Sequence, residues 1–432
     1  MGGKKVRRCF MKEKEILAGA KERIRKYRTA ELAVEVTDKR GNPRPQVQVE
    51  VRQTRHEFLF GCHLGRLERF TDKQREIYER HFAALLNYAS VGFAWAHFES
   101  ERGKPNYERV NQLVEWCEAC KMTVQGHLVM WNHRACSPTW LPEDPAEILK
   151  HCDTHVRNVV SHYKGRIKYY ILVNEPTDCF RAEAPKEMAY DTAVTRAWKH
   201  EGKIPFAKRF FPIAHKADPA AGQLINDYRL DKPYEKIIER LVDARGRPLY
   251  DVIGLQSHMH FAYWGVEKVW DILERYARFK KPLHFTENTV LSGRCRSRDT
   301  IRWLYQDPNW KSTKIGEKRQ ANQVAELYTL IFSHPAVQAF SWFNLQDYGW
   351  LGAPGGLLRA DDLSPKPAYE KLHGLIKGEW WTQAAAETNG KGRCSVRAFY
   401  GDYAITVKRG AAKKTVQHYH TRDDRKPVKI VL

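Results

Sequence analysis

The sequence predicts an α/β protein: a (β/α)8 barrel with a small β-sandwich-like module built from the two ends of the chain. Between residues 56 and 378, eight short apolar stretches alternate with longer, helix-sized segments, which is typical of a parallel barrel. The flanking sequence alternates apolar and polar residues at period two, as half-buried strands do. The length of 432 residues accommodates both parts. A doubly wound sheet is the competing fold, but no Gly-rich dinucleotide loop follows the first strand.

The N-terminal part predicts one helix and two strands. Apolar residues recur at helical spacing among the charges of residues 11–28, which predicts a helix. Residues 31–38 (ELAVEVTD) and 46–53 (QVQVEVRQ) alternate in polarity, and the turn-forming sequence KRGNPRP separates them. This arrangement predicts a β-hairpin. The first two modules are therefore a basic helix at 1–28 and a hairpin at 29–55.

The predicted barrel occupies residues 56–378. Helix-sized segments such as 106–120 and 146–163 separate its strands. The strands are expected at 58–61, 88–93, 124–130, 168–175, 223–228, 252–258, 282–288 and 339–344. Residues 379–432 are again β-rich, and we expect them to pair with the N-terminal strands in one accessory module. Structural packing is the favoured role for that module, and carbohydrate binding is the alternative.

The net charge of +22 is concentrated at the ends of the chain. Residues 1–30 and 391–432 each carry eleven Lys and Arg against three acidic residues. Solvated basic ends account for this pattern, and no nucleic-acid-binding motif accompanies it, so we expect no nucleic-acid partner. No run of apolar residues is long enough for a membrane span.

The spacing of the cysteines does not indicate a disulfide framework or a metal site. Nine cysteines are spread along the chain, and Cys117 and Cys120 form a CxxC without a second ligand pair, which favours reduced cysteines packed in a helix. No His/Asp cluster shows metal-ligand spacing, so neither a metal nor an organic cofactor is expected.

The first residues lack the apolar core of a secretory signal. The localisation stays open: secreted or periplasmic if a signal was removed, otherwise cytoplasmic. The oligomeric state also stays open.

Polar and aromatic residues gather where the predicted strands end, which is where barrel enzymes place their chemistry. Two of them, Glu175 and Glu287, suit glycoside hydrolysis, in which one carboxyl group protonates the leaving oxygen and the other attacks the anomeric carbon. For retention the two groups should lie roughly 5–5.5 Å apart. The other residues at these ends are His127, Trp131, Asn174, Asn226, Asp227, Gln256, His258, Trp342 and Trp350.

Four of these residues have specific expected roles beside the glutamates. Asn174 is placed to hydrogen-bond a sugar hydroxyl, and His258 to hold Glu287 ionised through a hydrogen bond. Trp342 and Trp350 offer flat apolar faces on which sugar rings stack.

Six short stretches occur in a recognisable order: GHLVMW, VNEP, LINDY, GLQSH, TEN and SPKPAY, between residues 126 and 369. With this order and spacing the chain resembles glycoside hydrolase family 10, the endo-β-1,4-xylanase family. The resemblance implies a retaining hydrolase of polysaccharides or oligosaccharides, with Glu175 as acid/base and Glu287 as nucleophile. It also implies that the sugar subsites are lined by His127, Trp131, Asn174, Gln256, His258, Trp342 and Trp350.

The chain departs from the family after the second barrel strand. The family carries a Glu-Asn pair and a lysine there, whereas this chain has Gly-Phe-Ala-Trp at 92–95, with His97 and Glu99 as the nearest polar groups. A site that bonds hydroxyls discriminates strongly when its partners change. The prediction of unsubstituted xylan as the substrate is therefore weaker than the family name suggests.

A second departure follows the nucleophile, where Asn288 and Thr289 stand. The loop beyond them carries arginines that could meet a carboxylate or sulfate group, although a solvated basic loop is the more ordinary explanation. Those arginines are Arg294, Arg296, Arg298 and Arg302. Two alternatives stay open: the same mechanism on another β-glycan that bears uronate or sulfate, and a non-catalytic carbohydrate-binding barrel.

Overall fold

The structure is a computed structural model that describes residues 13–65, 67–178, 191–301 and 305–432. Its chain divides into two compact units. The barrel unit comprises residues 60–324 and 336–369, and the β-rich unit comprises residues up to 59 together with 325–335 and 370–432.

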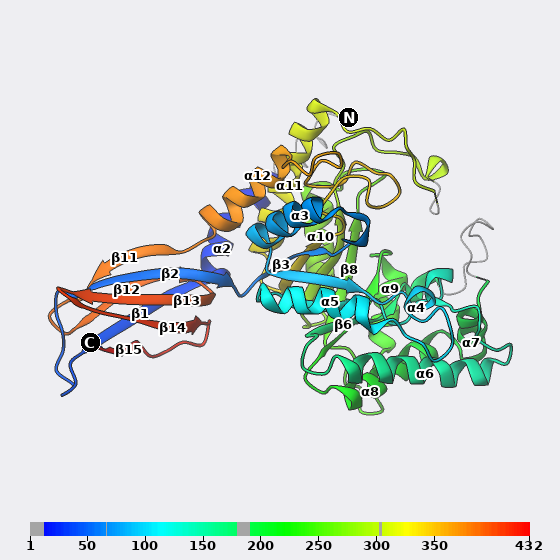
Figure 1. Cartoon of the computed structure of the whole chain (residues 1–432), viewed down its shortest axis with the longest axis horizontal. Coiled ribbons are helices and arrows are strands. Elements are labelled where there is room, and N and C mark those ends of the chain that lie inside the picture. Colours follow the sequence, from blue (N-terminus) through cyan, green and yellow to red (C-terminus); the bar gives the residue numbers. More distant parts are fainter. Residues whose placement is uncertain (1–12, 66, 179–190, 302–304) are drawn as a thin grey trace. The chain divides into compact units, whose positions relative to one another are not determined.

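The barrel unit contains a closed eight-stranded barrel with the strand order β10-β3-β4-β5-β6-β7-β8-β9 (Figure 1). Each of the eight predicted strands is confirmed. Their bounds are β3 (Leu59–His63), β4 (Tyr88–Gly92), β5 (Thr123–His127), β6 (Tyr169–Asn174), β7 (Gly222–Asp227), β8 (Val252–His258), β9 (Leu283–Thr289) and β10 (Val337–Trp342). Because helices cover a parallel barrel, its strands are buried on both faces, and every residue of β9 is buried.

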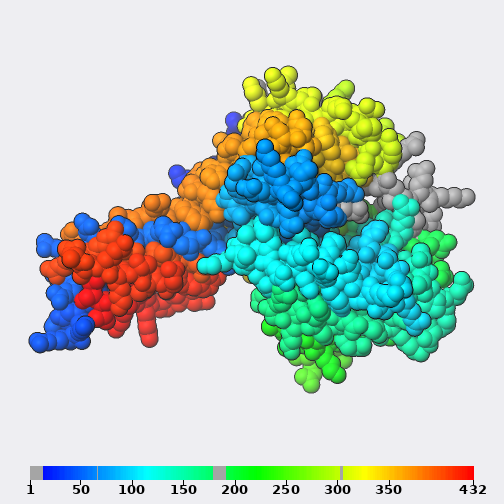
Figure 2. Space-filling view, viewed as in Figure 1, coloured from blue at the N-terminus to red at the C-terminus, as the bar shows by residue number. Residues whose placement is uncertain are grey.

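Helices connect the strands and cover the barrel from outside. Side chains of α3, α5 and α6 form much of the face of this unit in Figure 2. The helices are α3 (Asp72–Leu85), α4 (Trp95–Phe98), α5 (Tyr107–Ala119), α6 (Pro145–His162), α7 (Ala193–Glu201), α8 (Lys203–Ala217), α9 (Lys232–Arg240) and α10 (Gly265–Ala277). Two further helices, α11 (Lys314–Ser333) and α12 (Pro367–Gly374), begin in this unit and end in the β-rich unit. Their sequences carry ordinary start signals: Thr71 and Gln74 form a capping box at α3, and Asp144 caps α6 ahead of a proline.

The β-rich unit begins with helical turns at residues 13–28, which include α2 (Ala20–Arg28). Two sheets follow, with the strand orders β12-β1-β15 and β11-β2-β13-β14. Their bounds are β1 (Thr29–Thr37), β2 (Gln48–His56), β11 (Gln383–Glu387), β12 (Arg393–Phe399), β13 (Gly401–Arg409), β14 (Ala412–His420) and β15 (Val428–Val431). Side chains from both sheets share one apolar core, which includes Leu32, Val51 and Ile405. The predicted sandwich-like module is therefore confirmed.

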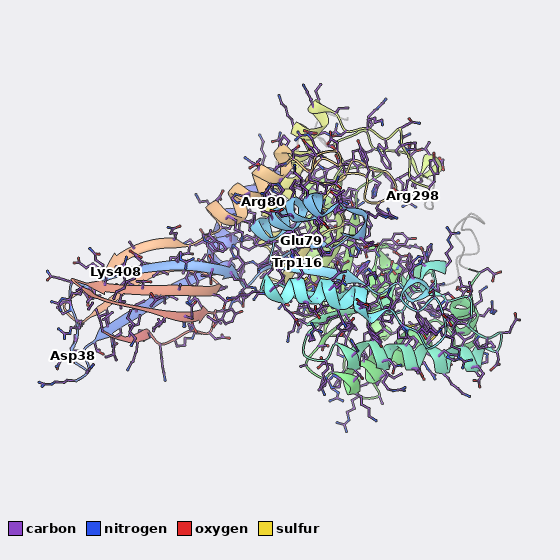
Figure 3. The ribbon with its side chains drawn as sticks, viewed as in Figure 1. Asp38, Glu79, Arg80, Trp116, Arg298 and Lys408 are labelled. Carbon is purple, nitrogen blue, oxygen red and sulfur yellow. The ribbon has the colours of Figure 1, made fainter. Side chains whose placement is uncertain are left out.

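The predicted hairpin between the first two strands is wrong. β1 pairs with β12 and β15, whereas β2 pairs with β11 and β13. Each strand has a single apolar face, and the two faces cover the shared core from opposite sheets, with Val34 on β1 and Val49 on β2. The link starts in a turn, where Oδ1 of Asp38 accepts hydrogen bonds from the backbone N–H groups of Arg40 and Asn42, both at 2.9 Å (Figure 3). This turn folds Pro43 and Arg44 back against the end of β1 for a single antiparallel bridge, and the chain then crosses to the second sheet.

The described cysteines are all free, and Cys117 lies buried in α5, as predicted. Among the helices that the structure describes, none combines the length and apolar character needed to cross a membrane.

Candidate active site

The two glutamates lie at the carboxyl ends of two barrel strands, β6 and β9, which β7 and β8 separate in the barrel. Glu175 directly follows β6 and Glu287 belongs to β9, and their exposed fractions are only 9% and 6%. The backbone of Glu175 adopts the left-handed region, with φ +52°, which costs a non-glycine residue about 1–3 kcal/mol. A 2.8 Å hydrogen bond from its N–H to the carbonyl of Asn226 helps to hold this conformation. Strain of this kind clusters at functional sites.

Glu287 receives hydrogen bonds on both carboxylate oxygens. Nδ2 of Asn226 donates to Oε1 at 2.9 Å, and Nε2 of His258 lies 3.1 Å from Oε2. Burial lowers the pKa of His258 to about 3, so its ring is neutral. Because the Thr289 hydroxyl lies 3.1 Å from Nδ1 and can donate to it, we assign the ring proton to Nε2, where it faces Glu287. Both contacts favour a negative charge on Glu287, and the hydrogen-bond contact expected for His258 is present.

Glu175 has a different electrostatic environment. Burial and the charges of Asp227 and Glu287 raise its pKa to about 8, against one hydrogen bond from Gln256 at 3.1 Å. Burial also raises the pKa of Glu287 to about 8, and the hydrogen bond from Asn226 opposes that shift. Two carboxyl groups that repel each other ionise one after the other. The donors around Glu287 favour the charge there, and the carboxylates near Glu175 favour a proton on Glu175.

Asn226 connects the two sides of the site. Its Nδ2 also donates to Oδ1 of Asn174 at 2.8 Å, and the same oxygen lies 3.3 Å from Nε2 of Gln256. The hydroxyl of Thr286 donates to Oδ1 of Asn226 at 2.7 Å, which orients the amide so that Nδ2 faces Glu287. A chain of side-chain amides therefore runs between the two glutamates.

A glycine makes room for this amide. Gly254 on β8 pairs with Asn226 on β7. A Cβ at position 254 would lie 2.5 Å from Oδ1 of Asn226 and 3.0 Å from the carbonyl oxygen of Ile225. Only glycine fits here without moving the side chain that contacts Glu287.

A cleft of about 720 Å³ lies over the strand ends, and its walls include the predicted residues His127, Trp131 and Trp350. Neither glutamate is among its described lining residues. The ring of His258, which bonds Glu287, lies 4.3 Å from that of Trp350. On the other side Cys136, also in the cleft wall, is close enough to Glu175 for that charge to act on its thiol. The predicted residues Asn174, Gln256 and His258 surround the glutamates instead of lining the cleft.

Four aromatic residues that line the cleft were not singled out from the sequence: His63, Phe70, Phe343 and Tyr348. His63 ends β3, and its ring stacks on that of Phe343 at 5.5 Å, with an interplanar angle of 13°. His127 joins them, 5.0 Å from His63. His63 and Phe343 stand at strand ends, so the rule that identified His127 marks their positions but does not show which way each side chain points.

The predicted stacking role of Trp342 is contradicted. Its side chain is 0% exposed, and its Nε1–H donates to the carbonyl of Gly355 at 2.8 Å. Successive residues of a strand point to opposite sides, so the next residue, Phe343, faces the cleft instead. Trp350 does line the cleft, from the loop beyond.

The region that lacks the family's Glu-Asn pair packs inward. Trp95 is buried against His155, with ring centroids 4.3 Å apart, and its Nε1–H donates to Glu99 at 2.9 Å. Glu99 therefore supports packing, whereas His97 lines the cleft. A positively charged side chain comes from α5 instead: Arg109 also lines the cleft and donates to the carbonyl of Gly92 at 3.0 Å. No sequence signal pointed to Arg109.

The described arginines of the basic loop make contacts of their own. Arg296 forms an ion pair with Asp307 at 2.6 Å, and Arg298 (Figure 3) lies over the ring of Phe261 at 5.1 Å. Neither they nor Arg294 are among the described residues that line the cleft. Arg302 lies outside the described residues.

The SPKPAY stretch supplies a buried ion pair that anchors the loop carrying Trp350. Nζ of Lys366, which is 0% exposed, lies 2.9 Å from Oδ1 of Asp347 and also donates to Ser292 and to the carbonyl of Gly356. Asp347 in turn accepts from the N–H of Gly356 at 2.8 Å. The motif therefore has a structural role beneath one wall of the cleft.

Comparison with known proteins matches residues 51–374 to the family model Glycosyl hydrolase family 10. Endo-1,4-beta-xylanase B of Thermotoga neapolitana is 25% identical over 326 residues, which cover 71% of this chain and 84% of that protein. Anti-sigma-I factor RsgI6 of Acetivibrio thermocellus is 24% identical over 403 residues, 90% of this chain. The chain spans only 46% of RsgI6 and 43% of endo-1,4-beta-xylanase 3 of Arabidopsis thaliana, which is 23% identical over 83% of this chain.

Solved structures of xylanases share the fold. Native xylanase 10B from Thermotoga maritima superposes with a TM-score of 0.58 at 22% identity, covering 75% of this chain and 96% of that one. Xylanase 10B from Thermotoga petrophila, solved with xylobiose, gives 0.57 at 22% identity, over 75% and 95%. The closed barrel and the match over three quarters of the sequence agree, and the chain belongs to glycosyl hydrolase family 10.

Proposed function

We propose that this chain hydrolyses a β-linked polysaccharide by double displacement, in the manner of an endo-β-1,4-xylanase. The observation that carries the proposal is the asymmetry of the carboxyl pair: Asn226 and His258 donate to Glu287, while acidic neighbours surround Glu175. Membership of family 10 and the xylanases among its relatives support the substrate class.

In the first step, the Glu175 carboxyl group gives its proton to the glycosidic oxygen as the bond to the anomeric carbon breaks. The Glu287 carboxylate attacks that carbon from the opposite face and forms a glycosyl ester. In the second step, ionised Glu175 takes a proton from water, the water oxygen attacks the same carbon, and Glu287 leaves as carboxylate. Two inversions restore the original configuration.

An acid-bearing β-glycan is a second candidate substrate, because unpaired cations line the cleft. Within the described residues, Arg69 and Arg109 form no ion pair, and Arg109 uses one donor on the carbonyl of Gly92. One exposed acid, Glu68, also lines the cleft. Guanidinium groups bind carboxylates and sulfates through paired hydrogen bonds. This supports a uronate or sulfate substituent on the substrate.

The test is hydrolysis of a panel containing xylan, glucuronoxylan and a sulfated β-glycan by the wild type, Glu175→Ala and Glu287→Ala. The proposal expects reducing sugar from at least one polymer with the wild type and no turnover with Glu287→Ala. A preference for glucuronoxylan that Arg109→Gln removes would identify the acidic substituent. Binding without any product would overturn the proposal and favour a non-catalytic carbohydrate-binding barrel. Full activity in either glutamate variant would overturn the proposed roles of the two residues.

A further inference from the structure

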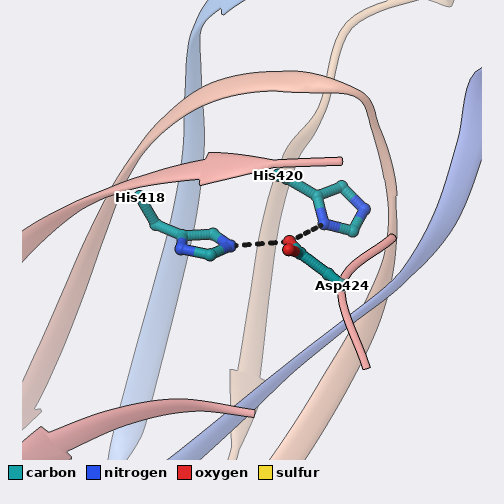
Figure 4. Close-up of side chains that lie close together, drawn as sticks. All are labelled: His418, His420 and Asp424. Atoms are coloured by element: carbon teal, nitrogen blue, oxygen red, sulfur yellow. Dashed lines mark hydrogen bonds and ion pairs between the residues drawn. The ribbon is translucent and has the colours of Figure 1, made fainter. Parts of the chain in front are cut away.

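A cluster of metal-ligating side chains lies in the β-rich unit, at the end of β14. His418 and His420 occupy alternate positions of the strand and therefore share a face. Asp424 follows in the turn toward β15 (Figure 4). One ligand atom from each of the three side chains lies within 4.8 Å of the other two. The expectation that no His/Asp cluster shows metal-ligand spacing is wrong for these residues.

The contacts converge on one oxygen. Oδ2 of Asp424 lies 3.0 Å from Nε2 of His418, 3.1 Å from Nδ1 of His420 and 3.2 Å from the backbone nitrogen of Thr421. The hydroxyl of Thr421 lies 3.3 Å from Oδ1. Three potential donors compete for one carboxylate oxygen, which has two lone pairs. A cation between the rings and the carboxylate would use the ring lone pairs and leave Asp424 oriented by Thr421.

The surroundings fix one ligand and leave the others reachable. The side chain of His420 is 0% exposed, near the rings of Tyr400 and Tyr403 at 5.6 and 6.1 Å. The side chains of His418 and Asp424 are 24% and 28% exposed. A preorganised ligand beside an open approach is what an exchangeable metal site requires.

We propose that this cluster binds a divalent transition-metal ion, best represented by Zn²⁺, through Nε2 of His418, Nδ1 of His420 and the Asp424 carboxylate. Zinc takes imidazole and carboxylate ligands at about 2.0–2.2 Å in a tetrahedron, with water in a free position. Ligand atoms of such a tetrahedron lie roughly 3.3–3.6 Å apart, so the nitrogen–oxygen distances of 3.0 and 3.1 Å need to lengthen only slightly. Mg²⁺ and Ca²⁺ prefer oxygen ligands throughout.

The ion would join the end of β14 to the segment that leads into β15. That strand lies at the edge of its sheet and pairs with β1. Its role is therefore to stabilise the β-rich unit, and the proposal does not depend on the proposed hydrolysis. An ion bound only to the folded state raises stability with its concentration.

The test is calorimetric titration of the full chain, stripped with a chelator, with ZnCl₂ and then with MgCl₂. We expect the wild type to bind one more Zn²⁺ than either His418→Ala or Asp424→Asn, and to gain a higher melting temperature on binding. Both substitutions are at partly exposed positions, so they spare the buried His420. His373→Ala, at an exposed histidine of α12, is the matched control and should bind as the wild type does.

Cobalt gives an independent readout, because its visible absorption reports coordination by ring nitrogens. Co²⁺ bands present in the wild type and in His373→Ala, but lost in His418→Ala, would support the site. Equal zinc stoichiometry in all four proteins, or no binding by the wild type, would overturn the proposal and leave the cluster as a set of hydrogen bonds.

Discussion

Asn226 donates a 2.9 Å hydrogen bond to Oε1 of Glu287 from an amide that Thr286 holds in place. This contact, together with the one from His258, distinguishes the two carboxyl groups of the site. The two donors favour a negative charge on Glu287, which fits the proposed mechanism in which Glu175 carries the proton.

Replacing Asn226 tests this contact. We expect Asn226→Ala to lower kcat about 10²–10³-fold, because a preoriented donor to the reacting carboxylate is lost. Steady-state kinetics on the polymer found active in the panel measures the effect. Asn309→Ala, on an exposed loop, is the control and should keep full activity. A kcat within twofold of the wild type in Asn226→Ala would contradict the role of the amide.

The pH profile tests the proton on Glu175. Burial raises the pKa of Glu175 to about 8, with smaller contributions from the charges of Asp227 and Glu287. Removing the charge of Asp227 lowers that pKa, so Glu175 loses its proton at lower pH. We expect Asp227→Asn to move the alkaline limb of the kcat/KM profile down by roughly one pH unit. Glu239→Gln, exposed on α9, should leave it in place. An unmoved limb in Asp227→Asn would show that another group controls it.

The buried ion pair beneath the cleft wall makes a stability prediction. Lys366→Met leaves Asp347 buried without its partner, which costs about 3–5 kcal/mol of unfolding free energy. Chemical denaturation followed by circular dichroism measures the loss, with Lys391→Met at an exposed turn as control. A loss below about 1 kcal/mol, the value of a surface pair, would contradict the anchoring role.

The two tryptophans are expected to behave differently. Trp350→Ala removes an aromatic face from the cleft wall and should raise KM with a nearly unchanged melting temperature. Trp342→Ala creates a cavity and should cost about 3–5 kcal/mol of stability. Comparing KM and melting temperature in the two variants separates the roles. A raised KM and an unchanged melting temperature in Trp342→Ala would restore the stacking role that its burial contradicts.

The barrel and its glutamates could be predicted from the sequence because both follow from local pattern. Parallel strands covered by helices are apolar throughout, and polar residues at their ends stand out. Glu175 and Glu287 interrupt such runs. Asn226 also does so, but its importance depends on register: β7 places it beside Gly254 of β8, and only this neighbour leaves room for its amide.

The missed features depend on contacts between distant segments. The sequence does not reveal that Trp342 points away from the cleft and Phe343 toward it, because the two consecutive residues are both aromatic. An alternating pair of strands predicts a hairpin or opposite sheets equally well, and the shared core of β1 and β2 decides for the latter. Arg109 reaches the cleft from a helix, where neither spacing nor neighbours mark it.

The most direct test of the central claim is the configuration of the first product, followed by proton NMR during hydrolysis of a β-linked oligosaccharide from the polymer that the wild type cleaves. Attack by Glu287 and then by water predicts that the β-anomer appears first and mutarotates later. Initial release of the α-anomer would mean a single displacement, and would contradict the assignment of Glu287 as nucleophile.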